Sequence, residues 1–203
     1  MDTNNPFADG DTFEDQVFSD LDLNGADLSG KDFVRCTFRK LLLQETRWPQ
    51  TRLEDCVFDG CDLTRMQPKK LALRGVEFIG CRLTGVDWTD VAANPAVAFE
   101  GCNLQYASFV SVNLTGARLV RCRAIEVNFI EARLTGADFS GSDLSGSKFE
   151  HCDLRQADFR ETTGLFLDPA NNRVKGARIN LPSAVLLAVS FGLRVSGFDE
   201  DVD

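Results

Sequence analysis

Large apolar residues recur at every fifth position of this chain, from Phe13 to Phe159, with one extra residue between Trp88 and Phe99. Two positions before each of them stands a small or moderately apolar residue, and all seven cysteines fall in this phase. Two positions after each of them glycine concentrates. A period of five fits neither an α-helix nor a simple β-strand. The pattern predicts a short extended segment followed by a tight turn, repeated along the chain.

The extended segment fixes which residues face inward. The large residue and the residue two positions before it lie on the same side of such a segment. Glycine then occupies the turn, where a positive φ is often needed. We therefore expect the large residues and the cysteines to line a common core.

A second period, of twenty residues, shows how the units close. One series of every fourth large residue is mostly Phe and the next is mostly Leu. The two series are Phe18, Phe38, Phe58, Phe78, Phe99, Leu119, Phe139, Phe159 and Leu23, Leu43, Leu63, Leu83, Leu104, Ala124, Leu144. Four units therefore make one coil, and at the inter-strand spacing about seven to eight coils give a rod roughly 35 Å long. We predict an all-β protein, a right-handed quadrilateral parallel β-helix with a short C-terminal α-helix.

The sequence divides into four parts. Residues 1–10 form an N-terminal extension, and residues 11–164 form the β-helix, with irregularities near 65–70 and 90–98. Residues 165–197 contain the C-terminal cap and helix, because Pro182 suits a first helical turn and Gly192 suits the position past a helix end. Residues 198–203 form an acidic tail.

Charge and composition indicate which kinds of binding partner the protein can have. A formal net charge of −9 argues against direct nucleic-acid binding, which needs basic surface. The charge fits a partner with a basic groove, and it also fits solubility alone. The chain has no apolar run of about 18 residues, and its N-terminus has no signal-peptide pattern. We expect a cytoplasmic protein with no membrane contact.

Catalytic chemistry has little support in the sequence. His151 is the single histidine, and the repeat phase turns it outward while Cys152 turns inward, so no nucleophilic pair is expected. Cys61, Cys81, Cys102 and Cys122 should form one inward ladder, whose rungs about 4.8 Å apart do not make a tetrahedral metal site. We predict no catalytic residue, no metal and no cofactor.

The repeat units resemble a known family. Ala-Asp-Leu-Ser-Gly (26–30), Ala-Asp-Phe-Ser-Gly (137–141) and Ser-Asp-Leu-Ser-Gly (142–146) match the pentapeptide-repeat pattern. The chain further resembles the topoisomerase-protecting branch, which confers quinolone, albicidin or microcin resistance, in its irregular mid-chain segments and its apolar C-terminal segment. This resemblance implies a DNA mimic that binds DNA gyrase or topoisomerase IV and forms a homodimer through the C-terminal helix.

Three groups of residues are candidates for binding. The irregular segments, as interruptions of a rigid scaffold, are candidate contact loops; they comprise Arg65, Met66, Gln67, Pro68, Lys69, Lys70, Asp90, Asn94 and Pro95. Acidic residues before the large apolar ones either cap turns or form a negative surface; they are Asp22, Asp27, Asp62, Asp87, Asp138, Asp143, Asp153 and Asp158. The apolar C-terminal residues cover the last coil, pair with a second copy, or do both; they are Leu181, Val185, Leu186, Val189, Phe191, Leu193 and Val195.

The leading hypothesis is a non-catalytic, dimeric protein that binds a type II topoisomerase and protects it from a poison. The loops are short, which fits the albicidin-type members of the family better than the quinolone-resistance members. The alternative is an interaction scaffold for an unrelated partner. A clustered negative stripe favours the first hypothesis, and scattered charge favours the second.

Overall fold

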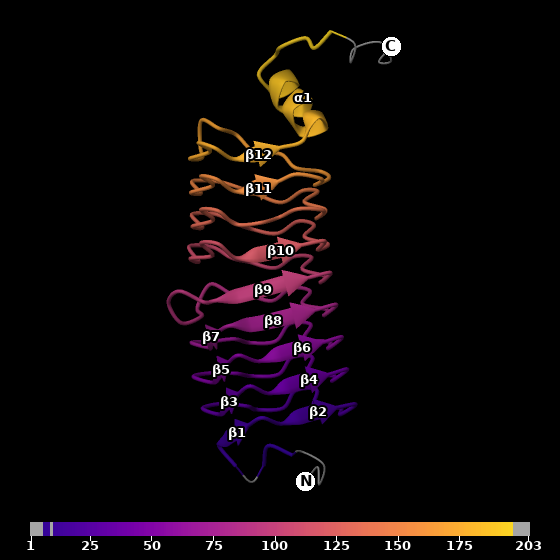
Figure 1. Cartoon of the computed structure of the whole chain (residues 1–203), viewed down its shortest axis with the longest axis vertical. Helices are drawn as coiled ribbons and strands as arrows, with labels where there is room; N and C mark the ends of the chain where they lie inside the picture. Colours follow the sequence, from indigo (N-terminus) through magenta and orange to yellow (C-terminus); the bar gives the residue numbers. More distant parts are fainter. Residues whose placement is uncertain (1–5, 9, 197–203) are drawn as a thin grey trace.

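The computed structural model describes residues 6–8 and 10–196 of the chain. It is a parallel β-solenoid of about eight turns with a single short helix in the described part, which confirms the predicted fold class. The coils stack into an elongated rod, with the N-terminal coil at one end and the helix α1 at the other (Figure 1). The predicted tail, residues 198–203, lies outside the described residues.

Each strand is two to four residues long and is centred on a large apolar residue. The strands are β1 (Thr12–Glu14), β2 (Val17–Ser19), β3 (Asp32–Val34), β4 (Thr37–Arg39), β5 (Arg52–Glu54), β6 (Val57–Asp59), β7 (Ala72–Arg74), β8 (Val76–Ile79), β9 (Val97–Glu100), β10 (Arg118–Val120), β11 (Asp158–Phe159) and β12 (Arg178–Ile179). One sheet has the order β1-β3-β5-β7, a second has the order β10-β9-β8-β6-β4-β2, and β11 pairs with β12. All these pairs are parallel, with partners twenty or twenty-one residues apart.

Stacked side chains fill the core. The rings of Phe38 and Phe58 lie nearly parallel with centroids 4.4 Å apart, and Phe129 and Phe149 stack in the same way at 4.8 Å. Like residues stack because a period of twenty places them at the same point of successive coils. The predicted aromatic and aliphatic ladders are therefore present.

The turns adopt the backbone conformation that the glycine phase predicted. Gly25 and Gly30 have φ of 69° and 68°, and Asp15 and Arg35 occupy the same turn position with φ of 54° and 52°. A residue with a Cβ is disfavoured in this left-handed conformation. The coil imposes it nonetheless, because the turn N–H donates to a carbonyl of the next coil, as Asp15 N does to Val34 O at 3.0 Å.

The segment predicted to be irregular, residues 65–70, keeps the phase of the coil, but Gln67 makes no bridge to Asp87 on the next coil. Pro68 occupies a large-residue position and is buried, Met66 is buried beside it, and Arg47 pairs with Gln67 in normal register. A proline fits there because its fixed φ is tolerated in extended backbone, although it has no N–H to donate to the next coil. The carbonyl of Pro68 still accepts a hydrogen bond from Leu71 N.

The coils continue past residue 164, where the sequence placed their end. Asp153 bridges Arg173, and β11 pairs with β12 through Phe159 and Ile179. Gly164 and Pro169 stand at the positions where the repeat would place large apolar residues, so the sequence pattern does not show the repeat here. Leu165 and Leu167 are buried instead. Paired residues on successive coils are still twenty residues apart here, although large apolar residues no longer recur at every fifth position.

Each end of the rod is covered. Phe7 is completely buried, and its ring packs edge-on against Phe13, Phe18 and Phe33. At the other end α1 (Leu181–Ser190) begins at Asn180, whose side chain accepts a hydrogen bond from Ser183 N. No helix in the described part is long and apolar enough to cross a membrane.

Candidate partner-binding surface

Residues 89–96 form a loop that protrudes from the rod between β8 and β9 (Figure 1). Ala92 N donates to Leu71 O at 2.9 Å, and Ala96 N donates to Leu73 O at 3.0 Å. The amide of Asn113 donates to Asn94 Oδ1 at 2.6 Å. These bonds tie the loop to the coils below and above it, so it is a fixed protrusion.

The loop presents part of the predicted contact set to solvent. Asp90 and Asn94 are exposed and Pro95 is half-buried. A groove of about 390 Å³ lies on one side, between the loop and residues 111–113, 131 and 133. A second groove, of about 270 Å³, lies on the other side, between the loop and residues 75–77 and 115–118.

The candidate residues 65–70 lie one coil below this loop. Lys70 N donates to Asp90 O at 2.5 Å, which joins the two candidate segments. The side chains of Arg65, Gln67, Lys69 and Lys70 are exposed, and the guanidinium of Arg65 pairs with Glu45 at 2.6 Å. Met66 and Pro68 face the core and are not available to a partner.

The candidate acidic residues all cap turns. Each of the eight accepts a hydrogen bond through a carboxylate oxygen from the backbone N–H two residues later. The donors are Asn24, Ser29, Thr64, Thr89, Ser140, Ser145, Arg155 and Arg160. The turn-capping role considered in the sequence therefore holds at every one of these positions.

Many of the carboxylates are also neutralised by arginine. Asp27, Asp62, Asp153 and Asp158 pair with an arginine twenty residues later, on the next coil; these are Arg47, Arg82, Arg173 and Arg178. Asp22, Asp87, Asp138 and Asp143 make no ion pair within the described residues. The negative charge is therefore divided by rows of ion pairs and does not form one continuous stripe.

Among the candidate acidic residues, Asp153 has the most strongly lowered pKa. Side-chain hydrogen bonds from Arg155, at 2.6 and 2.7 Å, lower the pKa of Asp153 to about 2. The pKa of Asp158 is also lowered, first by the side-chain hydrogen bond from Arg160. Both carboxylates are charged at neutral pH.

The helix α1 carries an uncovered apolar face. Leu181 is 75% exposed and Phe191 58% exposed, and Leu186, Val189 and Leu193 are also exposed. Val185 is buried against the rod and Val195 is half-buried. The predicted interface set therefore divides into a part that covers the last coil and a larger part that faces solvent.

The interior offers no assembled chemistry. Cys152 is buried while His151 is exposed at a turn, so the two do not form a nucleophilic pair. All seven cysteines are free and buried. No group of three or more His, Cys, Asp or Glu residues in the described ranges could hold a metal ion.

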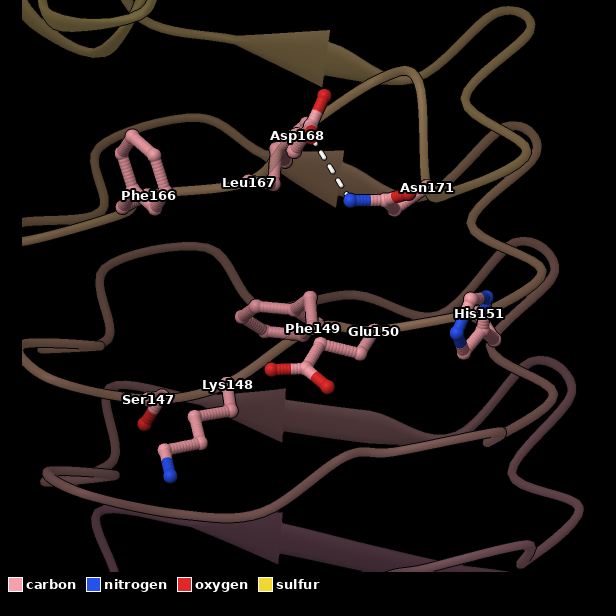
Figure 2. Close-up of a pocket in the computed structure, with 9 residues that line it drawn as sticks. All are labelled: Ser147, Lys148, Phe149, Glu150, His151, Phe166, Leu167, Asp168 and Asn171. Carbon is pink, nitrogen blue, oxygen red and sulfur yellow. Dashed lines mark hydrogen bonds between the residues drawn. The ribbon is translucent and has the colours of Figure 1, made fainter. Parts of the chain in front are cut away.

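A pocket of about 260 Å³ lies near the C-terminal end of the rod, between residues 147–151 and residues 166–171 (Figure 2). Nothing in the repeat pattern indicated it. The signal that could have revealed it is the loss of the large-residue phase at Gly164 and Pro169. Phe166, which lines the pocket, is 56% exposed.

The described residues form a closed, densely packed rod with a fixed loop on its side and a partly apolar helix at its end. Residues 95–164 match the family model described as the pentapeptide repeat region. The five-residue period continues on both sides of that match. Over residues 95–164 the chain is therefore similar to the pentapeptide-repeat family.

A quinolone resistance protein is similar to part of this chain at modest identity. The chain is 28% identical over 106 residues to the quinolone resistance pentapeptide repeat protein QnrB96 of Scandinavium goeteborgense, with 47% of this chain and 50% of that protein covered. The matched segment thus spans half the length of that curated relative. The likeness to the quinolone-resistance branch noted in the sequence is confirmed.

Two solved structures are also similar. A trypsin-treated form of QnrB1, a plasmid-mediated fluoroquinolone resistance protein, is 29% identical, with 91% of this chain and 89% of that chain covered and a TM-score of 0.48. HetL, a pentapeptide repeat protein of the cyanobacterium Nostoc involved in heterocyst differentiation regulation, is 21% identical, with coverage of 82% and 86% and a TM-score of 0.34.

Proposed function

We propose that this chain is a non-catalytic protein that binds a type II topoisomerase, DNA gyrase or topoisomerase IV, and protects it from a poison. The observation that carries this proposal is the similarity to a quinolone resistance pentapeptide repeat protein. A rigid rod with a fixed loop supports it, because such a scaffold presents contacts without an ordering cost. This function places the protein in the cytoplasm.

The contact is local rather than a full imitation of DNA. B-DNA carries one charge per about 1.7 Å of axis, whereas this chain carries a net charge of only −9, and many of its carboxylates are paired with arginine. The unpaired Asp87 lies just before the loop, and the exposed Asp90 lies within it. We propose that they and Asn94 orient the rod in a basic groove of the enzyme.

We further propose that two chains associate through α1. Leu186, Val189 and Phe191 form an exposed apolar surface of the kind that marks an interface. Light scattering after size-exclusion chromatography tests this: Leu186→Asp should yield a monomer. The matched control is Val17→Asp, an exposed residue at the opposite end of the rod, which should leave the dimer unchanged.

The function is tested by gyrase supercoiling and DNA-cleavage assays with purified protein, with and without a quinolone or albicidin. We expect rescue of supercoiling, or inhibition by the protein alone at micromolar concentration. Asp90→Arg should weaken the effect, whereas Asp20→Arg, at an exposed turn in a distant coil, should not. A folded dimer with no effect on either enzyme contradicts the proposal.

The second candidate is a scaffold for a partner unrelated to topoisomerase. The rows of Asp–Arg pairs favour it, since they leave scattered rather than clustered charge. Affinity capture with the wild-type rod, compared with Asp90→Arg, distinguishes the two. Recovery of a topoisomerase subunit that Asp90→Arg loses supports the first function, and loop-dependent recovery of another protein supports the second.

A further inference from the structure

Successive coils on the face that carries Asn128 and Lys148 are joined by the same two hydrogen bonds. Asn128 bridges Lys148 in parallel register. Lys148 N donates to Val127 O at 2.9 Å, and Lys148 O accepts from Phe129 N at 2.9 Å. This is the normal parallel pattern, in which one residue of the upper coil uses both its N–H and its C=O.

On the next coil, no described residue pairs with the backbone groups on either side of Lys148, and we call this unpaired position the vacant rung. Above Lys148, the equivalent groups are the carbonyl of Ser147 and the N–H of Phe149, and neither has a hydrogen-bond partner among the described residues. Asp168, twenty residues after Lys148, makes no bridge to it. The carbonyl of Ser147 and the N–H of Phe149 together match the N–H and the carbonyl of one extended residue, as in the coil below.

The chain itself is held away from this site. The carbonyl of Asp168 accepts hydrogen bonds from Asn171 N at 3.2 Å and from the amide of Asn172 at 2.9 Å. Its carboxylate accepts from Ala170 N and from the amide of Asn171, both at 2.8 Å. Because these bonds fold residues 168–172 into their own turn, that segment does not pair with the backbone of residues 147–149.

The gap is the pocket of about 260 Å³ in Figure 2. Phe149 and Leu167 line its inner side and are buried, and Phe166 stands half-exposed at its edge. Lys148 and Glu150 lie on the outer side, and neither makes an ion pair in the described part of the chain. The site thus has free backbone groups, an apolar wall and two unpaired charges of opposite sign.

We propose that this vacant rung binds one short extended peptide segment of a partner protein, which adds a strand in parallel register. The residue beside Lys148 donates its N–H to Ser147 O and accepts from Phe149 N through its carbonyl. Its side chain is acidic, following the stacked pairs Asp27–Arg47 and Asp62–Arg82. The next residue of the peptide is small and apolar and faces Leu167. The residue after that is basic and lies beside Glu150.

The site is independent of the topoisomerase proposal, and synthetic peptides test it with the full chain. The probe is the amidated, acetylated peptide Ser-Asp-Ala-Lys-Ser. Its composition-matched control is Ser-Lys-Ala-Asp-Ser, and a third peptide carries an N-methyl group on Asp, which removes the N–H while keeping every charge. Binding is followed by the 15N–1H shifts of Phe149 and Lys148.

We expect a saturable shift of the Phe149 amide with the probe at millimolar concentration, and no saturable shift with the N-methyl peptide. Exposed ion pairs are worth about 1 kcal/mol or less, so the control peptide should bind up to about fivefold more weakly. In Lys148→Glu, an exposed change that leaves the fold intact, this preference should disappear, because each peptide then places one charge beside an opposite charge and one beside a like charge. No shift of Phe149, or equal binding of the probe and the N-methyl peptide, overturns the proposal.

Discussion

The indole Nε1 of Trp48 donates a 2.8 Å hydrogen bond to the hydroxyl of Thr46, whereas the indole Nε1 of Trp88, two coils higher, is buried without a partner. Val86 stands at the position that Thr46 occupies below. The hydroxyl of Thr46 also donates to Leu43 O at 2.6 Å. One methyl group in place of a hydroxyl therefore leaves a buried donor unsatisfied.

Val86→Thr should stabilise the protein, because it supplies the missing acceptor without changing side-chain shape. The gain should be about 1 kcal/mol, the net value of a buried hydrogen bond. Chemical denaturation followed by tryptophan fluorescence measures it. The reciprocal change, Thr46→Val, should cost a similar amount, and a loss of stability in Val86→Thr would show that its hydroxyl does not reach the indole.

Two glycines at equivalent backbone angles should respond differently to alanine. Gly116 and Gly164 have φ of 70° and 63°. A Cβ on Gly116 meets nothing within 4 Å, whereas one on Gly164 lies 2.6 Å from Ser145 Cα. Gly116→Ala should cost about 1–2 kcal/mol for the left-handed backbone alone, and Gly164→Ala should cost clearly more. Equal losses in urea denaturation would mean that residue 164 can move away from Ser145.

Phe7 should be the most important residue outside the repeats. Its ring covers the first coil, with centroids 4.7 Å from Phe18 and 5.3 Å from Phe13. Phe7→Ala should destabilise the rod by about 3 kcal/mol, as for other buried Phe truncations. Val17→Ala is the control, because Val17 is 64% exposed on the same coil. A thermal melt in which the two variants match would show that the end of the rod needs no cap.

The sequence predicted the coil well because three residue classes share one period. Its phase assigned the buried residues of the repeats correctly and placed the glycine turns, and the structure adds that non-glycine residues such as Asp15 and Arg35 adopt the same left-handed conformation. Such turns follow from the repeat geometry, not from local preference. The same periodicity predicted the stacked ladders, since a spacing of twenty fixes what lies above each residue.

The features that the sequence missed lie where the residue types depart from the period. Pro68 looked like a break, yet a coil position that needs only an extended φ accepts proline. Gly164 and Pro169 removed the apolar signal, so the continued coil and the vacant rung beside Phe149 were both invisible. Which carboxylates pair with arginine also depends on neighbours twenty residues away, as Asp62 and Arg82 show.

Asp153 should make the rod sensitive to acid. Hydrogen bonds from Arg155 depress its folded-state pKa to about 2, below the unfolded value of about 3.9. Its contribution to stability is therefore complete above pH 4 and is lost as the pH falls towards 2. Asp153→Asn keeps the turn cap but not the charge. Its melting temperature should lie below wild type at pH 7 and approach wild type near pH 2.

Asp20→Asn provides the matched control for this experiment. Its side chain is exposed and makes no hydrogen bond or ion pair within the described residues. Its melting temperature should follow that of the wild type at every pH. A constant difference between wild type and Asp153→Asn from pH 7 to pH 2 would show that Asp153 acts through its shape and not through its charge.

The cysteines should be unreactive in the native rod. Each thiol is buried and lies near a carbonyl of the coil below, as Cys61 Sγ lies 3.3 Å from Phe38 O. Burial raises the pKa of Cys56 and of Cys152 to about 11, so these two thiols form little thiolate at pH 8, and burial keeps all seven away from a reagent. A chromogenic thiol reagent should therefore label no cysteine in the folded protein and all seven in guanidinium chloride. Because labelling then requires a coil to open, its rate should fall in Val86→Thr and rise in Phe7→Ala. Rapid stoichiometric labelling of any one thiol in native wild-type protein would contradict a closed core.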